Sequence, residues 1–130
     1  MTIKELSQLY YLNREIEQLA QELAEKESAA TSATTKITGL PHAGSMSDKA
    51  ALWAAIADAR TIIEAKQKIC VAEYNKLIRY IASVEDSMMR QILTLRFVNG
   101  LSWRQVANHI GGNNTEDGVR MAATRFIEAN

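Results

Sequence analysis

The sequence has one cysteine, one proline and no excess of either charge. A single thiol, Cys70, excludes an internal disulfide and is typical of proteins in a reducing compartment. No apolar run approaches the roughly 20 residues that a membrane-spanning helix requires. The first residues also lack the charged-then-apolar layout of a secretory signal peptide. We therefore expect a cytoplasmic protein without a membrane partner.

The sequence also lacks the residue clusters that carry common chemistry. Its two histidines, His42 and His109, stand apart from Cys70 without the spacing of metal ligands. There is no glycine-rich phosphate loop, no nucleophile elbow and no Glu-x-x-His pair. We predict no catalytic residues, no metal site, no cofactor and no small-molecule substrate, so the protein is not expected to be an enzyme.

The chain does contain strong helical periodicity. Hydrophobic residues make up 47% of the sequence, and strand signals are nearly absent, which indicates an all-α fold. A heptad seam typical of a coiled coil predicts one helix over residues 2–27 and a second over residues 49–84. The seam residues are Leu9, Leu12, Ile16, Leu19 and Leu23, then Leu52, Ile56, Ala59, Ile63, Cys70, Leu77, Ile81 and Val84. Two such helices are expected to pack as a long antiparallel hairpin.

Between these helices, residues 28–47 lose the periodicity and are rich in small and hydroxyl residues, with Gly39, Pro41 and Gly44. They predict a loop, which is long for a compact domain. One interpretation is a simple connector, and the other is a docking arm or phosphate-touching loop that carries Lys36 and His42. We assign residues 1–84 to a hairpin domain for dimerisation or partner docking.

Residues 85–130 predict a second domain of three short helices. Ser102 and Gln105 form a capping-box pattern, so a helix should begin at Trp103. Gly111 stands where a left-handed C-terminal cap ends that helix, and Thr115 can cap the next. A helix over 86–98 precedes them. Apolar spacing of i, i+3, i+4 and i+7 in both helices, with a glycine corner between them, predicts a helix-turn-helix. Its predicted core is Val106, Ala107, Ile110, Gly111, Val119, Ala122 and Phe126.

Leu95 to Ala107 reads LRFVNGLSWRQVA. It resembles the region-4 helix-turn-helix of bacterial sigma factors, in which a Leu-Arg-Phe/Tyr helix, a Gly-Leu-Ser turn and an aromatic-x-x-Ile/Val-Ala helix recur. The whole chain is similar to small phage and prophage proteins of Gram-positive hosts, close to the ArpU and RinA type phage transcriptional regulators. The corner at 111–114 is two residues longer than the sigma pattern, which affects how the second helix would meet DNA. The resemblance implies a DNA-binding transcriptional regulator in a bacterial host cell.

If the last helix is the recognition helix, its polar face should contact DNA. An arginine there can pair with guanine edges, and a carboxylate can accept from cytosine. The start of the preceding helix is placed to hold phosphate. The predicted DNA-binding set is Trp103, Arg104, Thr115, Glu116, Asp117, Arg120, Met121, Thr124 and Arg125. The alternative is that Glu116 and Asp117 are ordinary helix-dipole partners and that the two arginines of the last helix are solvated surface.

Charge limits the affinity of a single copy. From Asp86 onward there are five arginines against four carboxylates, a net charge of +1, whereas proteins that neutralise DNA phosphates usually carry a basic patch. We therefore expect modest affinity for promoter or operator DNA per monomer, a homodimer, and RNA polymerase as a further candidate partner. Two alternatives stay open: a protein-binding adaptor that acts on RNA polymerase or another viral or host protein without base readout, and a DNA-packaging small subunit.

Overall fold

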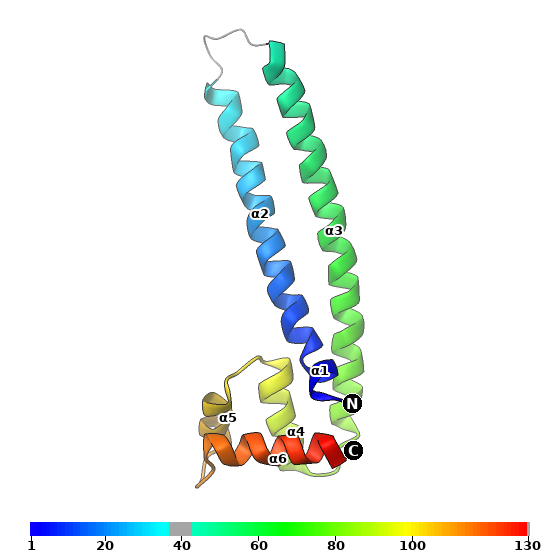
Figure 1. Cartoon of the computed structure of the whole chain (residues 1–130), viewed down its shortest axis with the longest axis vertical. Coiled ribbons are helices and arrows are strands. Elements are labelled where there is room, and N and C mark those ends of the chain that lie inside the picture. Colours follow the sequence, from blue (N-terminus) through cyan, green and yellow to red (C-terminus); the bar gives the residue numbers. More distant parts are fainter. Residues whose placement is uncertain (37–42, 130) are drawn as a thin grey trace. The chain divides into compact units, whose positions relative to one another are not determined.

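The computed structural model describes residues 1–36 and 43–129. It describes their side chains too, except those of residues 32–36 and 43–47. Throughout these residues the chain forms helices joined by short turns, with no strand, which confirms the predicted all-α fold (Figure 1). The elements are α1 (Ile3–Leu6), α2 (Gln8–Lys36), α3 (Ala43–Ala82), α4 (Ser87–Leu93), the π-helical turn η1 (Thr94–Val98), α5 (Trp103–Ile110) and α6 (Glu116–Ala129).

The chain forms two compact units. Met1–Asn13 and Cys70–Asn130 make up the first, which we call the terminal unit, and Arg14–Ile69 make up the second, the hairpin unit. The first turns of α2 and the last turns of α3 therefore belong with the C-terminal helices. The division predicted at residues 84 and 85 does not coincide with either boundary of these units.

In the hairpin unit, α2 and α3 run antiparallel. Glu15 of α2 pairs with Lys66 of α3 at 2.6 Å, and Glu27 of α2 pairs with Arg60 of α3 at 3.0 Å. A later residue of α2 thus pairs with an earlier residue of α3, as in an antiparallel pair. In this unit, predicted seam residues are buried or half-buried, namely Ile16, Leu19, Leu23, Leu52, Ile56, Ala59 and Ile63. The predicted antiparallel hairpin is confirmed in this unit.

The terminal unit has one continuous core. Leu6 and Leu9 from the N-terminal helices and Leu77 and Ile81 from α3 belong to the same buried cluster as residues of the C-terminal helices. The other buried members are Val84, Met89, Ile92, Leu93, Phe97, Val106, Ala107, Val119, Ala123 and Ile127. Because the N-terminal residues supply part of this core, the helix-turn-helix is supported by both ends of the sequence.

The predicted bounds of the two long helices were wrong, and so was most of the predicted 28–47 loop. α2 continues to Lys36 instead of ending at residue 27, and α3 begins at Ala43 instead of 49. Alanines sustain a helix well, and Ala30 is 1% exposed, so it adds a packed residue to α2. The Thr31 hydroxyl donates to the Glu27 carbonyl at 2.8 Å, which accommodates this residue inside the helix.

α3 extends upstream of its predicted start at residue 49, because adding a residue to an existing helix gains a hydrogen bond without a new nucleation step. The second helix was predicted to end at 84 and ends at Ala82. The interpretation of His42 as part of a phosphate-touching loop lies outside the described residues.

The N-terminal helix was also predicted as one element, and it is interrupted at Ser7. Thr2 and Glu5 form a capping box in which the Thr2 amide donates to Glu5 at 2.8 Å and the Glu5 amide donates to Thr2 Oγ1 at 3.2 Å. The bond from the Thr2 amide lowers the pKa of Glu5. This box defines α1 as a separate first turn.

The helix predicted over 86–98 starts as expected, with Asp86 accepting from the Met88 amide at 3.2 Å. It ends differently, in the π-helical turn η1, where the Asn99 amide donates to the Thr94 carbonyl five residues back at 3.0 Å. One extra residue is thus inserted into the last turn.

Candidate nucleic-acid interface

The start of α5 is fixed by the predicted capping box. The Gln105 amide donates to Ser102 Oγ at 3.2 Å, and the Ser102 amide donates to Gln105 Oε1 at 2.9 Å. Both bonds satisfy amides that a helix start would otherwise leave unpaired. The helix begins at Trp103 as predicted, and Arg104 is exposed on its first turn.

The corner between α5 and α6 requires glycine. Gly111 has φ 75° and ψ −163°, and Gly112 has φ 66°. The positive φ predicted for Gly111 is confirmed, but its ψ is not that of a left-handed helical cap and falls in a region used almost only by glycine. The Asn114 side-chain amide donates to the Gly111 carbonyl at 2.9 Å, which closes the corner.

Thr115 caps α6 as predicted. Its hydroxyl accepts from the Gly118 amide at 3.0 Å, and its carbonyl accepts from the Val119 amide at 3.0 Å. Glu116 and Asp117 occupy the first turn, where carboxylates interact favourably with the positive end of the helix dipole. The Thr115 hydroxyl is thus committed to the cap.

The predicted helix-turn-helix core is packed as expected. Val106, Ala107 and Val119 are buried, and the others, Ile110, Gly111, Ala122 and Phe126, are half-buried. Ala123 and Ile127 are buried as well, at 0% and 4% exposure. Ile127 was missed by the sequence reasoning, although its position eight residues after Val119 falls on the same helix face.

The polar face of α6 is exposed at Glu116, Asp117, Arg120, Met121 and Arg125, and half-buried at Thr124. Two of these residues interact with each other, because Arg120 donates to Asp117 at 3.2 Å. The Thr124 hydroxyl donates to the Arg120 carbonyl at 2.8 Å. Helical spacing places Met121 and Arg125 opposite the buried face.

Arg125 differs from Arg120 in its partners. Among the ion pairs of the described residues, none includes Arg125 or Arg104. Arg120 also lines a cavity of about 170 Å³ together with Ile3, Arg96, Trp103 and other residues of the terminal unit. Arg125 is therefore the cation of α6 that is most available to a partner.

Trp103 is half-buried and packs inside the terminal unit. Its ring meets Phe97 edge to face, with centroids 6.3 Å apart, and the Arg96 guanidinium carbon lies 4.8 Å from its ring centroid. Arg96 additionally donates to the Leu101 carbonyl at 2.9 Å. The indole that was predicted to contact DNA therefore also supports the turn before α5.

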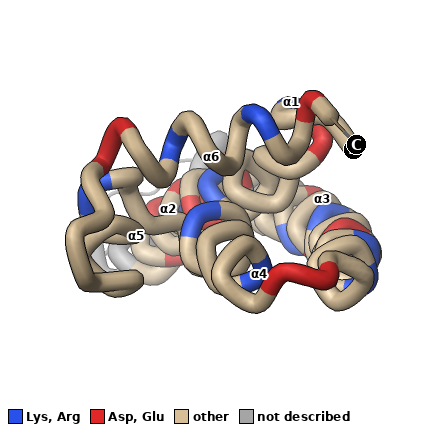
Figure 2. Tube along the Cα trace, turned by 90° about the horizontal axis from the view of Figure 1, so that it is seen from below, with Lys and Arg blue, Asp and Glu red and all other residues tan. Residues whose placement is uncertain are grey.

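Charges of both signs lie along α6. Glu116, Asp117 and Glu128 are near its ends, and Arg120 and Arg125 lie between them (Figure 2). The other parts of the terminal unit, residues 1–13 and 70–85, add three basic and three acidic residues, so the unit keeps a net charge of +1. The terminal unit therefore has little net positive charge with which to attract DNA.

Within the described part of the chain, no group of three or more His, Cys, Asp or Glu side chains is arranged to hold a metal ion. No helix in that part is long and apolar enough to cross a membrane. Cys70 donates to the Asn13 side-chain oxygen at 3.1 Å, and burial raises the pKa of its thiol.

Sequence reasoning missed the contribution of the N-terminal helices to this region. Tyr10 lies against Gly100 in the turn before α5, where an added Cβ would come within 3.3 Å of the tyrosine ring. Ser7, Tyr10, Arg96 and Gln105 line one cavity. No sequence signal links residues 7–11 to residues 96–105, so this proximity follows from the fold alone.

Comparison with known proteins gave no match: no family model, no curated protein and no solved structure is significantly similar to this chain.

Proposed function

We propose that this protein is a phage or prophage transcriptional regulator that binds promoter or operator DNA through the helix-turn-helix α5–α6. The observation that carries the proposal is the solvent-facing side of α6, where Arg125 stands without an acidic partner among the described ion pairs. It projects from a helix held by buried Val119, Ala123 and Ile127. The likeness of Leu95 to Ala107 to sigma region 4 supports the same proposal.

In this proposal, α6 enters the major groove and α5 contacts the backbone. Arg125 pairs with a guanine edge, and Met121 adds an apolar contact with the base edges. Arg104, exposed on the first turn of α5, contacts a phosphate. Arg120 contributes less, because Asp117 already compensates part of its charge.

A terminal unit with a net charge of +1 can make few phosphate contacts, and a second copy of the chain would supply more. The hairpin unit exposes Trp53 at 48%, Ile62 at 48% and Ile69 at 52%. Large apolar residues exposed along a helical hairpin favour burial against another helix. We therefore propose a homodimer that places two helix-turn-helix units on one DNA site.

The proposal is tested by measuring DNA affinity for two arginine variants. A duplex enriched from a random pool by the wild-type protein serves as the ligand, and fluorescence anisotropy gives Kd. Arg125→Ala should weaken binding about 5- to 150-fold, which corresponds to the loss of one bidentate base contact. Arg120→Ala should weaken it less.

The matched control is Arg79→Ala, which removes the same charge from an exposed position on α3 in the same unit. Binding that responds equally to Arg125→Ala and Arg79→Ala would remove α6 as the recognition helix. A failure to enrich any duplex would reject DNA binding by this chain altogether.

The neutral charge and the Arg120–Asp117 pair favour one alternative, a protein-binding adaptor that acts on RNA polymerase or another viral or host protein. In that case, α6 would present Met121 and Arg125 to a protein groove instead of to bases. An adaptor should show no affinity for DNA that falls steeply with salt.

A further inference from the structure

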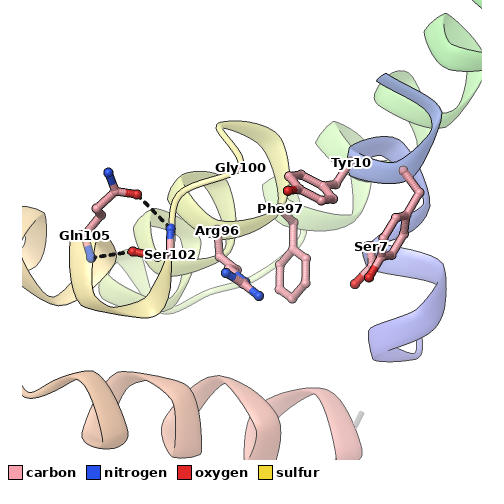
Figure 3. Close-up of a pocket in the computed structure, with 8 residues that line it drawn as sticks. Ser7, Tyr10, Arg96, Phe97, Gly100, Ser102 and Gln105 are labelled. Carbon is pink, nitrogen blue, oxygen red and sulfur yellow. Dashed lines mark hydrogen bonds between the residues drawn. The ribbon is translucent and has the colours of Figure 1, made fainter. Parts of the chain in front are cut away.

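A cavity of about 420 Å³ lies in the terminal unit, between the start of α2, the turn η1 and the start of α5 (Figure 3). Its polar lining consists of Ser7, Tyr10, Tyr11, Arg96, Ser102 and Gln105, and Phe97 and Gly100 complete it. The lining thus contains one cation and no carboxylate. A negatively charged ligand would meet an opposite charge there and no repulsion from the cavity wall.

Arg96 is held in place before any ligand arrives. One guanidinium nitrogen donates to the Leu101 carbonyl at 2.9 Å, and the guanidinium carbon lies 4.8 Å from the Trp103 ring centroid. None of the ion pairs in the described residues includes Arg96. Its charge is therefore oriented by neutral groups and stays uncompensated, which suits an arginine that binds an anion.

Arg96 also belongs to η1, the π-helical turn. Such single insertions into a helix frequently occur at functional sites.

Residues with further donor groups line the same cavity. Gln105 uses its side-chain oxygen to accept from the Ser102 amide at 2.9 Å, which leaves the N–H groups of its side-chain amide for another acceptor. Figure 3 shows this nitrogen directed away from Ser102. The hydroxyls of Ser7 and Tyr11 add two groups that can donate to an oxygen ligand.

We propose that this cavity is a phosphate-binding site, with Arg96 as its cation and Gln105, Ser7 and Tyr11 as its neutral donors. If the protein is a DNA-binding regulator, the phosphate is one of the DNA backbone. The assignment of the phosphate to DNA therefore rests on the proposed function. It assigns part of the DNA contact to the N-terminal helix, beyond the helix-turn-helix. A free phosphate ion or nucleotide offers the same chemistry, so the experiment has separate arms for the two sources.

The test is Gln105→Glu, which separates a structural role from a binding role. Glutamate at this position preserves the capping box and is favourable at a helix start, so stability should be maintained or raised. The same change places a carboxylate in the cavity and should repel a phosphate. Gln91→Glu is the matched control, because it adds the same charge at an exposed position of α4 outside the cavity.

Each protein is titrated with inorganic phosphate while amide and side-chain NMR signals are followed, and separately with the enriched duplex. In the wild type and in Gln91→Glu, phosphate should shift the signals of Arg96 Nε and the residue 105 amide. In Gln105→Glu, these shifts should be lost, and duplex affinity should fall at least fivefold below that of Gln91→Glu. The thermal midpoint of Gln105→Glu should be no lower than that of the wild type.

The outcomes separate the two proposals. If the duplex binds with sensitivity to Arg125→Ala, but both glutamate variants bind it equally and phosphate shifts nothing, the phosphate site is overturned and the regulator stands. If phosphate shifts the cavity signals in a Gln105-dependent way and no duplex binds, the site is supported with a free phosphate as its source, and DNA binding is rejected.

Discussion

Gly111 combines a positive φ with an extended ψ, and beyond its chain neighbours no heavy atom of the described residues lies within 4 Å of the place where a Cβ would stand. Its requirement for glycine therefore comes from the backbone itself and not from crowding by neighbours. The corner between α5 and α6 has five residues, Gly111 to Thr115, and this glycine sets the direction in which the chain leaves α5.

Gly111→Ala should lower the free energy of unfolding by about 1–3 kcal/mol, since an L side chain is strained in this region. Chemical denaturation gives the value. Asn108→Ala, at an exposed position of α5, is the control and should change stability by about 0.5 kcal/mol or less. An alanine at 111 that leaves stability unchanged would mean that the corner adopts another conformation.

At the scale of elements, the N-terminal turns of the chain are part of the helix-turn-helix unit. Leu6, 1% exposed, packs with Leu77, Ile81 and the C-terminal core although it lies about a hundred residues from α5 in sequence. A substitution in α1 should consequently change the stability of α4, α5 and α6.

Leu6→Ala should destabilise the terminal unit by about 2–5 kcal/mol, as removal of a buried leucine side chain generally does. In a Trp53→Phe background, Trp103 is the remaining tryptophan and its fluorescence reports on this unit alone. Ile3→Ala, at a residue 42% exposed, should have a much smaller effect. An effect of Leu6→Ala as small as that of Ile3→Ala would show that α1 does not belong to the core.

The elements predicted from the sequence are those with local signals. The Ser102–Gln105 capping box, the glycine corner and the i, i+3, i+4 spacing defined α5 and α6 correctly. The Thr2–Glu5 box is an equally local signal, and it fixes the start of α1. The hydroxyl content of residues 28–36 predicts a loop, whereas the burial of Ala30 is a tertiary effect that composition does not reveal.

In the candidate site too, some features have a local sequence signal and others depend on tertiary structure. The outward positions of Arg120, Met121 and Arg125 followed from the period of α6 and are exposed. The ion pair that distinguishes Arg120 from Arg125 depends on rotamers, and the approach of Tyr10 to Gly100 depends on the fold. Neither feature can be predicted from a single sequence.

At the scale of the whole molecule, the hairpin unit has few buried side chains. Among its described side chains, Ala30, Ile56 and Ile63 are the buried apolar ones, while Trp53, Ile62 and Ile69 are substantially exposed. With these three buried side chains among those described, such a unit would gain stability in the proposed homodimer.

The double variant Ile62→Lys, Ile69→Lys should convert the dimer into a monomer at micromolar concentration. Sedimentation equilibrium should give twice 14.5 kDa for the wild type and 14.5 kDa for the variant. Lys68→Arg, an exposed change of similar size on the same helix, should leave the mass of the dimer unchanged. A monomeric wild type would contradict the proposed homodimer, and a mass several times larger would favour a ring-forming subunit.

The proposed function requires that α5 and α6 bind duplex DNA, with Arg125 pairing with a base. Its most direct test is the affinity of the wild type and of Arg125→Ala for the enriched duplex from 50 to 200 mM salt. With about four phosphate contacts, wild-type affinity should fall roughly 100-fold over this range, and Arg125→Ala should bind more weakly with the same slope. Affinity that does not change with salt, or that is the same in both proteins, would contradict the claim.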